Sequence, residues 1–185
     1  MDQDQEISLY QKVKGDDRRA LTQLFTAYYS SLCNFALSIV KKPELAEELV
    51  ADVFFVLWRD RRHLDITYSV KAYLFRAVRN RAFRMVSGKN AIHEEIENHP
   101  APMALNHTPE SDYLYKELSI TYQKAYDSLP TRCKQVFKLS KIDGLKYQEI
   151  SYVLNISVKT VENQMFKALK VIRQAIANYR MEKLP

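Results

Sequence analysis

The stretch GLKYQEISYVLNISVKTVENQMFKALKVIR, residues 144–173, determines the fold of the second half of the chain. Its apolar residues recur at helical spacing on both sides of a break, which predicts a helix over 146–154 and another over 158–180. Asn155 tolerates the left-handed conformation that a tight turn needs, and Ser157 is a residue type that caps helices. The pattern is typical of a helix-turn-helix.

The second of these helices has two contrasting faces. Its apolar face contains Val158, Val161, Met165, Leu169 and Ile172, and its polar face contains Lys159, Thr160, Asn163, Lys167 and Lys170. Asn and Thr side chains can bond to base edges in a major groove, and Lys side chains can hold phosphates. The polar face therefore suits a DNA recognition helix. An ordinary surface helix in a helical hairpin would show a similar pattern, and this segment alone leaves both interpretations open.

Residues 69–88, SVKAYLFRAVRNRAFRMVSG, predict an amphipathic helix that Ser69 caps and Gly88 ends. One face is apolar: Leu74, Phe75, Val78, Ala82, Met85 and Val86. The other is aromatic, amide and cationic: Tyr73, Arg76, Arg79, Asn80, Phe83 and Arg84. Aromatic rings can stack on unpaired bases while arginines follow the phosphate backbone, so this face suits a single strand. The alternative is that Tyr73 or Phe83 packs against a neighbouring helix.

Residues 43–64, PELAEELVADVFFVLWRDRRHL, predict a helix to about Arg61 with a broad apolar face. A second cluster lies outside that face: Glu48, Asp52, Phe55 and Arg59. Charged residues around an additional phenylalanine indicate a protein-docking surface. Packing of Phe55 on the first helices is an equally good interpretation.

Helical periodicity extends over nearly the whole chain, with further helices expected over 6–14, from 17 to about 39, from 109 to about 128, and from 131 toward Gly144. Residues 89–112 carry a net charge of −4, between flanking regions of +3 and +7, and contain three prolines. We therefore expect an all-α protein with two small domains, 1–88 and 113–185, joined by a flexible acidic linker, 89–112. From Ser69 to Asn90 there are six basic residues and no acid, which indicates a polyanionic partner.

Several classes of protein are disfavoured. Only three glycines occur, too few for glycine-rich phosphate loops, and the two cysteines, Cys33 and Cys133, form neither a disulfide framework nor a zinc site. The four histidines have no metal-ligand spacing, and no catalytic arrangement of side chains is apparent. Neither a signal peptide nor a membrane-spanning run is present. We expect a cytoplasmic protein that is not an enzyme, needs no cofactor or metal, and does not insert into membranes.

Taken together, these segments resemble a bacterial RNA polymerase sigma factor of the extracytoplasmic-function (ECF) class. LVADVFFVLWRDR, residues 49–61, resembles the polymerase-docking helix of that family, and residues 69–86 resemble its promoter-melting helix. The stretch from Leu129 to Arg173 resembles its second conserved domain, and the S-V-K-T-V start of the recognition helix is especially characteristic. The sequences YLFRAVRNRA and VKTVENQMFKAL are most similar to those of sigma factors of the Bacteroidetes.

The resemblance implies three binding sites. Core RNA polymerase would contact Glu48, Asp52, Phe55 and Arg59; Ala51 departs from the glutamine that many relatives carry there. The melted strand of the minus-ten element would contact Tyr73, Arg76, Arg79, Asn80, Phe83 and Arg84. The minus-thirty-five duplex would contact Lys146, Ser157, Lys159, Thr160, Asn163, Gln164 and Lys167. The resemblance also implies an anti-sigma partner.

Two other functions remain open at this level. A stand-alone helix-turn-helix regulator would bind a palindromic duplex tightly without polymerase, although it would not need the stacking aromatics of residues 69–88. An all-α enzyme would need convergent titratable groups, which the sequence does not offer. A scaffold protein would leave both cationic faces unexplained.

Overall fold

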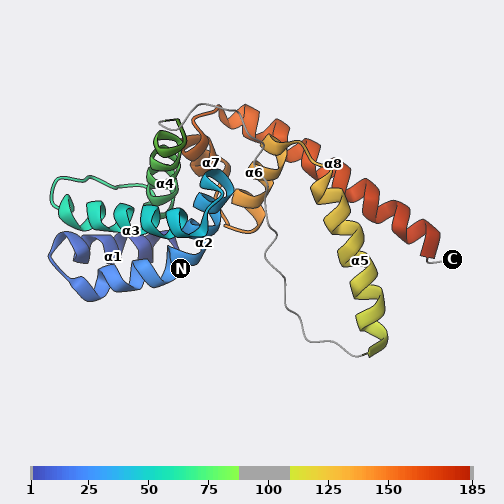
Figure 1. Cartoon of the computed structure of the whole chain (residues 1–185), viewed down its shortest axis with the longest axis horizontal. Helices are drawn as coiled ribbons and strands as arrows, with labels where there is room; N and C mark the ends of the chain where they lie inside the picture. Colours follow the sequence, from blue (N-terminus) through green and yellow to red (C-terminus); the bar gives the residue numbers. More distant parts are fainter. Residues whose placement is uncertain (1, 88–108, 184–185) are drawn as a thin grey trace. The chain divides into compact units, whose positions relative to one another are not determined.

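The computed structural model describes residues 2–87 and 109–183, and these residues form eight α-helices and no strand (Figure 1). The helices divide into two compact units, with α1 to α4 in the first and α5, α6 and α8 in the second; α7 links α6 to α8 along the chain. The all-α fold class expected from the periodicity is confirmed. Residues 89–108 of the expected linker lie outside the described residues, so its flexibility and the domain boundaries stay predictions.

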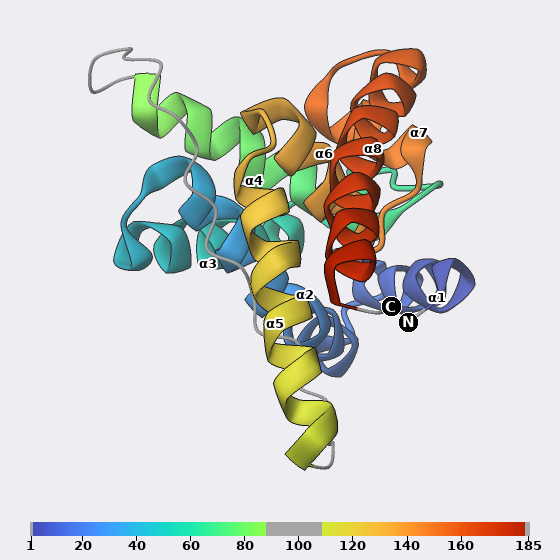
Figure 2. The same cartoon turned by 90° about the vertical axis from the view of Figure 1, so that its right-hand side faces the viewer.

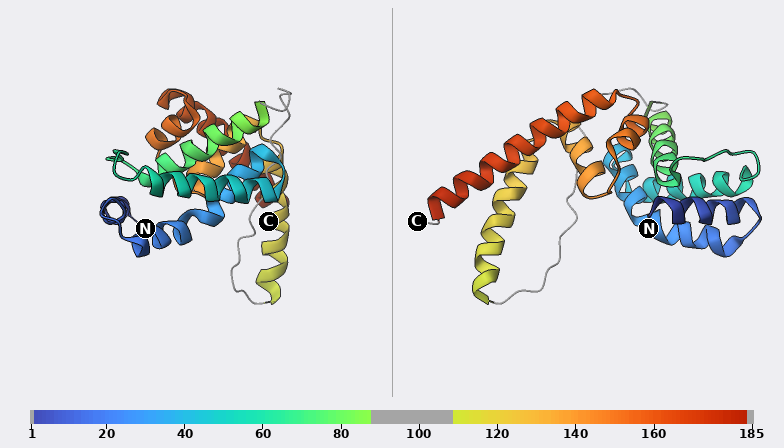
Figure 3. Two further views of the ribbon diagram at one scale, coloured as in Figure 1. Left: turned by 60° about the vertical axis from the view of Figure 1, so that its left-hand side comes forward. Right: turned by 180° about the vertical axis from the view of Figure 1, so that it is seen from behind.

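The first unit is arranged around α2 (Arg18–Val40), which packs against α1 (Gln3–Lys14), α3 (Pro43–Arg59) and α4 (Val70–Ser87) (Figures 1 and 3). The side chains of Leu24, Leu32 and Phe35 from α2 are fully or almost fully buried. The rings of Phe35 and Phe75 lie 5.2 Å apart in the centre of this core. Burial of one face of α4 in this core leaves Asn80, Phe83 and Arg84 exposed on the opposite face.

The second unit contains α5 (Pro109–Asp127), α6 (Thr131–Lys141) and α8 (Val158–Lys183), and the residues of α7 (Tyr147–Leu154) are divided between the two units. The helix α8 is continuous and packs against both α5 and α6 (Figure 2). The core of this unit includes Phe137 and Leu139 of α6 and Val161 and Met165 of α8, which are all buried. The ring of Tyr126, at the end of α5, is tilted by 58° relative to that of Phe137, with the ring centroids 6.0 Å apart.

Four helix boundaries differ most from the expected ones, and one of them is the end of α6, which lies at Lys141 rather than next to Gly144. The helix α1 begins at Gln3 rather than Glu6, because Asp2 caps it through a reciprocal hydrogen-bond pair with Gln5. The helix α3 ends at Arg59 instead of continuing to about Arg61. At the other end of the chain α8 continues to Lys183, beyond the expected residue 180. Among the residues that the structure describes, none of the helices has the length and apolarity needed to cross a bilayer.

Candidate nucleic-acid interface

The start of α4 is defined by its own cap. The Ser69 hydroxyl accepts a hydrogen bond from the Ala72 amide at 3.1 Å, and the Ser69 carbonyl accepts one from the Tyr73 amide at 3.1 Å. Ser69 itself is buried. The predicted capping role of Ser69 is therefore confirmed, and it fixes the residue at which the helix begins.

The exposed face of α4 contains the six residues expected to bind the melted strand. Asn80, Phe83 and Arg84 are exposed, and Tyr73, Arg76 and Arg79 are partly buried. The Phe83 ring keeps 40 % of its area exposed, and the Arg79 guanidinium lies over it at 4.9 Å from the centroid. Arg84 donates to the Asn80 carbonyl at 3.3 Å. The structure thus places an exposed aromatic ring, an amide and arginines side by side on one helix.

No acidic side chain neutralises this face from within α4, since residues 69–87 contain none. Partial burial and the neighbouring Arg76 charge lower the pKa of Arg79. A crowded set of positive charges on one helix face is stabilised by an anion, so the electrostatics favour a phosphate backbone as the ligand.

The four residues expected to dock polymerase all lie on the exposed side of α3. The Phe55 ring is 61 % exposed, which favours the docking interpretation over packing on the first helices. Phe55 borders an open apolar hollow of about 280 Å³ whose lining comes from α2 and α3: Leu21, Thr22, Phe25, Phe54, Phe55 and Trp58. A hollow of this kind, lined in part by the helix that also carries exposed Glu48 and Asp52, has the mixed apolar and charged character of a protein interface.

Two of the charged residues on α3 have partners within the protein. Arg81 of α4 donates to Asp52 at 2.9 Å, so Asp52 joins α3 to α4. Arg59 pairs with the next residue, Asp60, at 2.7 Å, and this hydrogen bond lowers the pKa of the Asp60 carboxyl. Both pairs are partly exposed, so a partner protein could exchange them at small cost.

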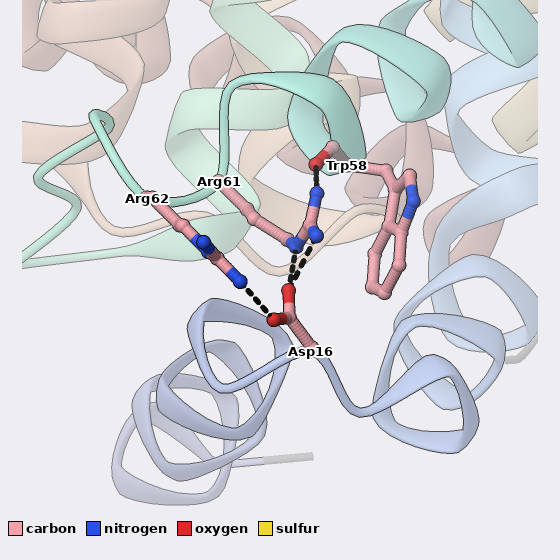
Figure 4. Close-up of polar contacts among 4 residues, drawn as sticks. All are labelled: Asp16, Trp58, Arg61 and Arg62. Carbon is pink, nitrogen blue, oxygen red and sulfur yellow. Dashed lines mark hydrogen bonds and ion pairs between the residues drawn. The ribbon is translucent and has the colours of Figure 1, made fainter.

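A polar cluster joins the turn between α1 and α2 to the end of α3 (Figure 4). Asp16, which has a left-handed φ of 68°, forms ion pairs with Arg61 and Arg62. Arg61 also donates to the Trp58 carbonyl at 2.5 Å, and its guanidinium lies 4.0 Å from the centroid of the Trp58 ring. Hydrogen bonds from Arg62 and Arg61 lower the pKa of the Asp16 carboxyl. These contacts hold the two arginines that follow the end of α3 against the turn between α1 and α2.

The turn between α7 and α8 has the geometry expected of a helix-turn-helix. Asn155 adopts a left-handed φ of 55°, as its position in the pattern predicts. Ser157 caps α8, because its hydroxyl accepts a hydrogen bond from the Thr160 amide at 3.1 Å and its carbonyl accepts one from Val161 at 3.1 Å. At the start of α7, the Glu149 carboxylate accepts from the Lys146 amide at 2.7 Å.

The predicted minus-thirty-five residues do not all share one environment. Lys159, Asn163 and Lys167 are exposed, and Lys159 forms an exposed pair with Glu162 at 3.3 Å. Thr160 is partly buried, and its hydroxyl bonds to that of Ser157 at 2.9 Å. Gln164 is turned toward α6, where its side-chain oxygen accepts from the buried Cys133 thiol at 2.8 Å. The structure therefore brings Lys159, Asn163 and Lys167 together on the solvent side. Ser157 and Thr160 belong to the start of α8, and Gln164 packs against α6. Lys146 is also exposed but lies apart from them in the chain, just before α7.

The sequence analysis missed two features. Phe166 of α8 is 69 % exposed and lies about one turn after Asn163 on the helix. This spacing was available as a signal, but an isolated aromatic in an amphipathic helix is usually part of the core. The second feature is Asp16, whose partners are 45 and 46 residues away in the sequence. Within the two described ranges, no group of three potential metal ligands occurs.

Comparison with known proteins agrees with this two-part organisation. Residues 24–91 match the family model for sigma-70 region 2, and residues 120–172 match the model for sigma-70 region 4. The first match spans most of α2 to α4, and the second spans the end of α5 through the helix-turn-helix into α8. This pair of regions, in this order, defines the sigma-70 class of transcription initiation factors.

Comparison with curated proteins shows which kind of sigma factor the chain is similar to. The chain is 23% identical over 183 residues to the RNA polymerase sigma-H factor of Pseudomonas aeruginosa, covering 94% of this chain and 95% of that protein. It is 23% identical to the ECF RNA polymerase sigma-E factor of Haemophilus influenzae, covering 91% of this chain and 94% of that protein. The ECF sigma-E factor of Escherichia coli K12 is 24% identical, with 92% and 91% covered. The chain belongs to the ECF sigma factors.

Solved structures show the same fold. The structure of CnrH in complex with the cytosolic domain of CnrY matches with a TM-score of 0.60 at 20% identity, covering 94% of this chain and 98% of CnrH. The sigma factor RpoE of Bartonella quintana, in complex with the anti-sigma factor NepR, matches with a TM-score of 0.57 at 18% identity, covering 84% of this chain and 96% of RpoE. The particular similarity to sigma factors of the Bacteroidetes is not tested by these matches and stays a prediction.

Proposed function

We propose that this ECF sigma factor divides promoter recognition between its two units. The first unit, residues 1–88, docks core RNA polymerase through the α3 residues Glu48, Asp52, Phe55 and Arg59. It captures the melted minus-ten strand on α4 through Tyr73, Arg76, Arg79, Asn80, Phe83 and Arg84. The second unit, residues 113–185, places α8 in the major groove of the minus-thirty-five element. Residues 89–112 act as the linker between the two sites.

The observation that carries the proposal is the exposed face of α4. A protein that binds only duplex DNA has no use for an exposed ring beside an amide and arginines, because paired bases offer no free faces for stacking. A base taken out of the duplex needs a pocket that offsets the unstacking energy, about a few kcal/mol. Phe83, with Arg79 over its ring and Asn80 beside it, has the chemistry of such a pocket.

On this proposal the chain performs no chemistry of its own. Core polymerase catalyses RNA synthesis, and the sigma factor supplies specificity by holding two DNA elements at once. Since both units are on one chain, binding of one element raises the effective concentration of the other, and the linker length restricts the spacings that are accepted. Trapping of the melted strand favours the open state of the promoter.

The proposal places the protein in the cytoplasm with core polymerase, promoter DNA and an anti-sigma factor as partners. Exposed Phe55 and the apolar hollow beside it support a protein partner for the first unit. Both structural relatives were solved in complexes with other proteins: CnrH with the cytosolic domain of CnrY, and RpoE with the anti-sigma factor NepR. These observations support regulation of this chain by a partner that covers its polymerase-binding or DNA-binding residues.

Reconstitution tests the proposal. The purified chain is mixed with sigma-free core polymerase, and co-elution and run-off transcription on sheared genomic DNA from the source are measured. A complex with discrete new transcripts is expected. Asn80→Ala should reduce open-complex formation more than it reduces polymerase binding. Tight binding of a palindromic duplex without polymerase would instead identify a stand-alone regulator.

A further inference from the structure

One face of α1 holds the segment that connects α3 to α4. Gln3 donates from its side-chain nitrogen to the Tyr68 carbonyl at 2.5 Å, and Tyr10 donates to the Leu64 carbonyl at 3.0 Å. Between them in the sequence, Glu6 contacts the start of α4 itself. Positions 3, 6 and 10 are three and four residues apart, so the three side chains lie on the same side of the helix. The connecting segment 60–69 is therefore fastened to α1 along its length.

Glu6 is the central contact of this face. It is a buried carboxylate, only 5 % exposed. One of its oxygens accepts a hydrogen bond from the Tyr28 hydroxyl of α2, and the other accepts one from the Lys71 amide at 3.3 Å. A buried carboxylate is costly unless it is hydrogen-bonded, and here both oxygens have donors. The position of Glu6 is thus specified by two other helices at once.

The Lys71 amide is one of the N–H groups in the first turn of α4 that have no partner within the helix. Ser69 satisfies the next one, at Ala72. A carboxylate at this point also interacts favourably with the positive end of the helix dipole. The first turn of α4 is therefore capped twice, once by its own serine and once by a charged group from another helix.

The contact at the first turn acts together with the buried side chains Leu74, Phe75 and Val78 to fix the rotation of α4 about its axis. Tyr73 and Arg76 follow Lys71 by two and five residues, and Asn80 and Phe83 lie on the same exposed side. We infer that Glu6 is a positioning residue, which sets the rotation and start of α4 so that its exposed face is preorganised for a single strand. This inference rests on the proposed role of α4 in capturing the melted minus-ten strand.

The test uses the full chain bound to core polymerase and three Glu6 or Tyr28 variants. Glu6→Ala removes both acceptors. Glu6→Gln keeps one acceptor oxygen but turns an NH2 group toward a donor, so one of the two hydrogen bonds is lost. Adding Tyr28→Phe to Glu6→Gln removes the competing hydroxyl and frees the amide oxygen for Lys71. Asp4→Asn is the matched control, since it makes the same charge change on an exposed residue of α1.

Three affinities are measured at a temperature where circular dichroism shows every variant folded. These are the affinity of the sigma factor for core polymerase, the affinity of the complex for a minus-thirty-five duplex, and its affinity for a template with a pre-melted minus-ten element. We expect Glu6→Gln to weaken binding of the pre-melted template about tenfold, the size of a hydrogen bond to a charged group. The other two affinities should stay within about twofold. The double variant should recover most of the loss, and Asp4→Asn should match the wild type.

Two results would overturn the inference. One is wild-type binding of the pre-melted template by both Glu6 variants. The other is an equal loss of all three affinities without recovery in the double variant, because this would mean that Glu6 only maintains the fold. Failure of the proposed function is a different result: the wild-type complex itself would show no preference for the pre-melted template over the duplex, and the inference would fall with it.

Discussion

The helices α4 and α8 both bury one apolar face and present a cationic one, yet the two presented faces differ in chemistry. On α4 the exposed groups are aromatic, amide and guanidinium groups, with no acid in residues 69–87. On α8 they are mostly lysine, amide and hydroxyl groups together with one exposed ring, Phe166, and Lys159 is paired with Glu162. Guanidinium groups and rings suit flat, unpaired bases, whereas short polar groups and lysines suit base edges and phosphates of a duplex. This difference in chemistry supports the proposal that the two helices bind DNA in different states.

The two helices also differ in how their starts are held. The residue that caps α8 is Ser157, which directly precedes this helix in the sequence. The start of α4 receives Ser69 and, in addition, Glu6 from a helix more than sixty residues earlier. A recognition helix that enters a preformed groove is oriented by the groove itself. A helix that must hold a flexible single strand has to supply the order, which is a reason for the second cap.

The largest effect is expected from the ring on α4. Phe83→Ala should weaken binding of a pre-melted minus-ten template about tenfold to a hundredfold, because a base–aromatic stack contributes about 1–3 kcal/mol. The measurement is the affinity of the polymerase complex for a fluorescent template that lacks a minus-thirty-five element. Phe166→Ala, which removes an exposed ring from α8 instead, should leave this affinity unchanged. Equal losses in both variants would erase the distinction between the two helices.

The next effect concerns the phosphate contacts of α8. Lys167→Glu should weaken binding of a minus-thirty-five duplex about tenfold and should lower the slope of log affinity against log salt by about 1. Titrations of a labelled duplex at several salt concentrations give both quantities. Arg173→Glu makes the same charge change elsewhere on the exposed surface of α8 and should affect binding less. An unchanged salt slope in Lys167→Glu would place the duplex on another face.

The sequence was sufficient to predict where the helices lie and which of their residues face outward. Periodicity located all eight described helices, and Pro43, Pro109, Asn155 and Ser157 marked starts and turns where the structure has them. These features are local, since a helix face and a cap depend on residues within one or two turns of each other. The residues expected to bind DNA and polymerase on α3 and α4 could be placed for the same reason.

Contacts between distant residues could not be predicted in this way. Gln164 has the right spacing for the polar face of α8, but the packing of α6 turns it toward Cys133. Asp52 looks like a free surface charge in the sequence, and only the packing of α3 on α4 reveals its pair with Arg81. Glu6 and Asp16 likewise have partners that lie 45 or more residues away. Such pairings depend on tertiary geometry, which no single-helix pattern contains.

A smaller effect, on the free energy of unfolding, is expected when the capping serines of the two helices are replaced. Ser157→Ala should lower the free energy of unfolding by about 1 kcal/mol, the usual cost of losing a cap, whereas Ser157→Gly should cost only a few tenths of that amount. Urea denaturation of the full chain, followed by circular dichroism, measures the change. Ser69→Ala should cost less than Ser157→Ala, because Glu6 still binds the first turn of α4. A larger cost at Ser69 would contradict the idea of a shared cap.

The smallest effect is expected at the exposed cluster around Asp16, and it depends on pH. Bonding to Arg62 and Arg61 lowers the pKa of Asp16 from its ordinary value of 3.8 in the folded protein. As the pH falls, the unfolded chain therefore binds the proton first, and the stabilisation is lost between the unfolded and the folded pKa. Asp16→Asn should be slightly less stable than the wild type at pH 7, with the difference shrinking as the pH falls below about 4. Asparagine tolerates the left-handed φ of 68°, so the backbone should not change.

Urea midpoints of the two proteins at pH 7 and at pH 3.5 give this difference directly. At 1 M salt, where the Debye length is about 3 Å, the difference at pH 7 should also shrink, because the cluster is exposed. Asp16→Gly separates charge from conformation, since glycine accepts the same φ without the carboxylate. If Asp16→Asn is as stable as the wild type at pH 7 in low salt, the ion pairs contribute nothing measurable. The segment before α4 would then be held to the first two helices chiefly through Gln3, Glu6 and Tyr10 of α1.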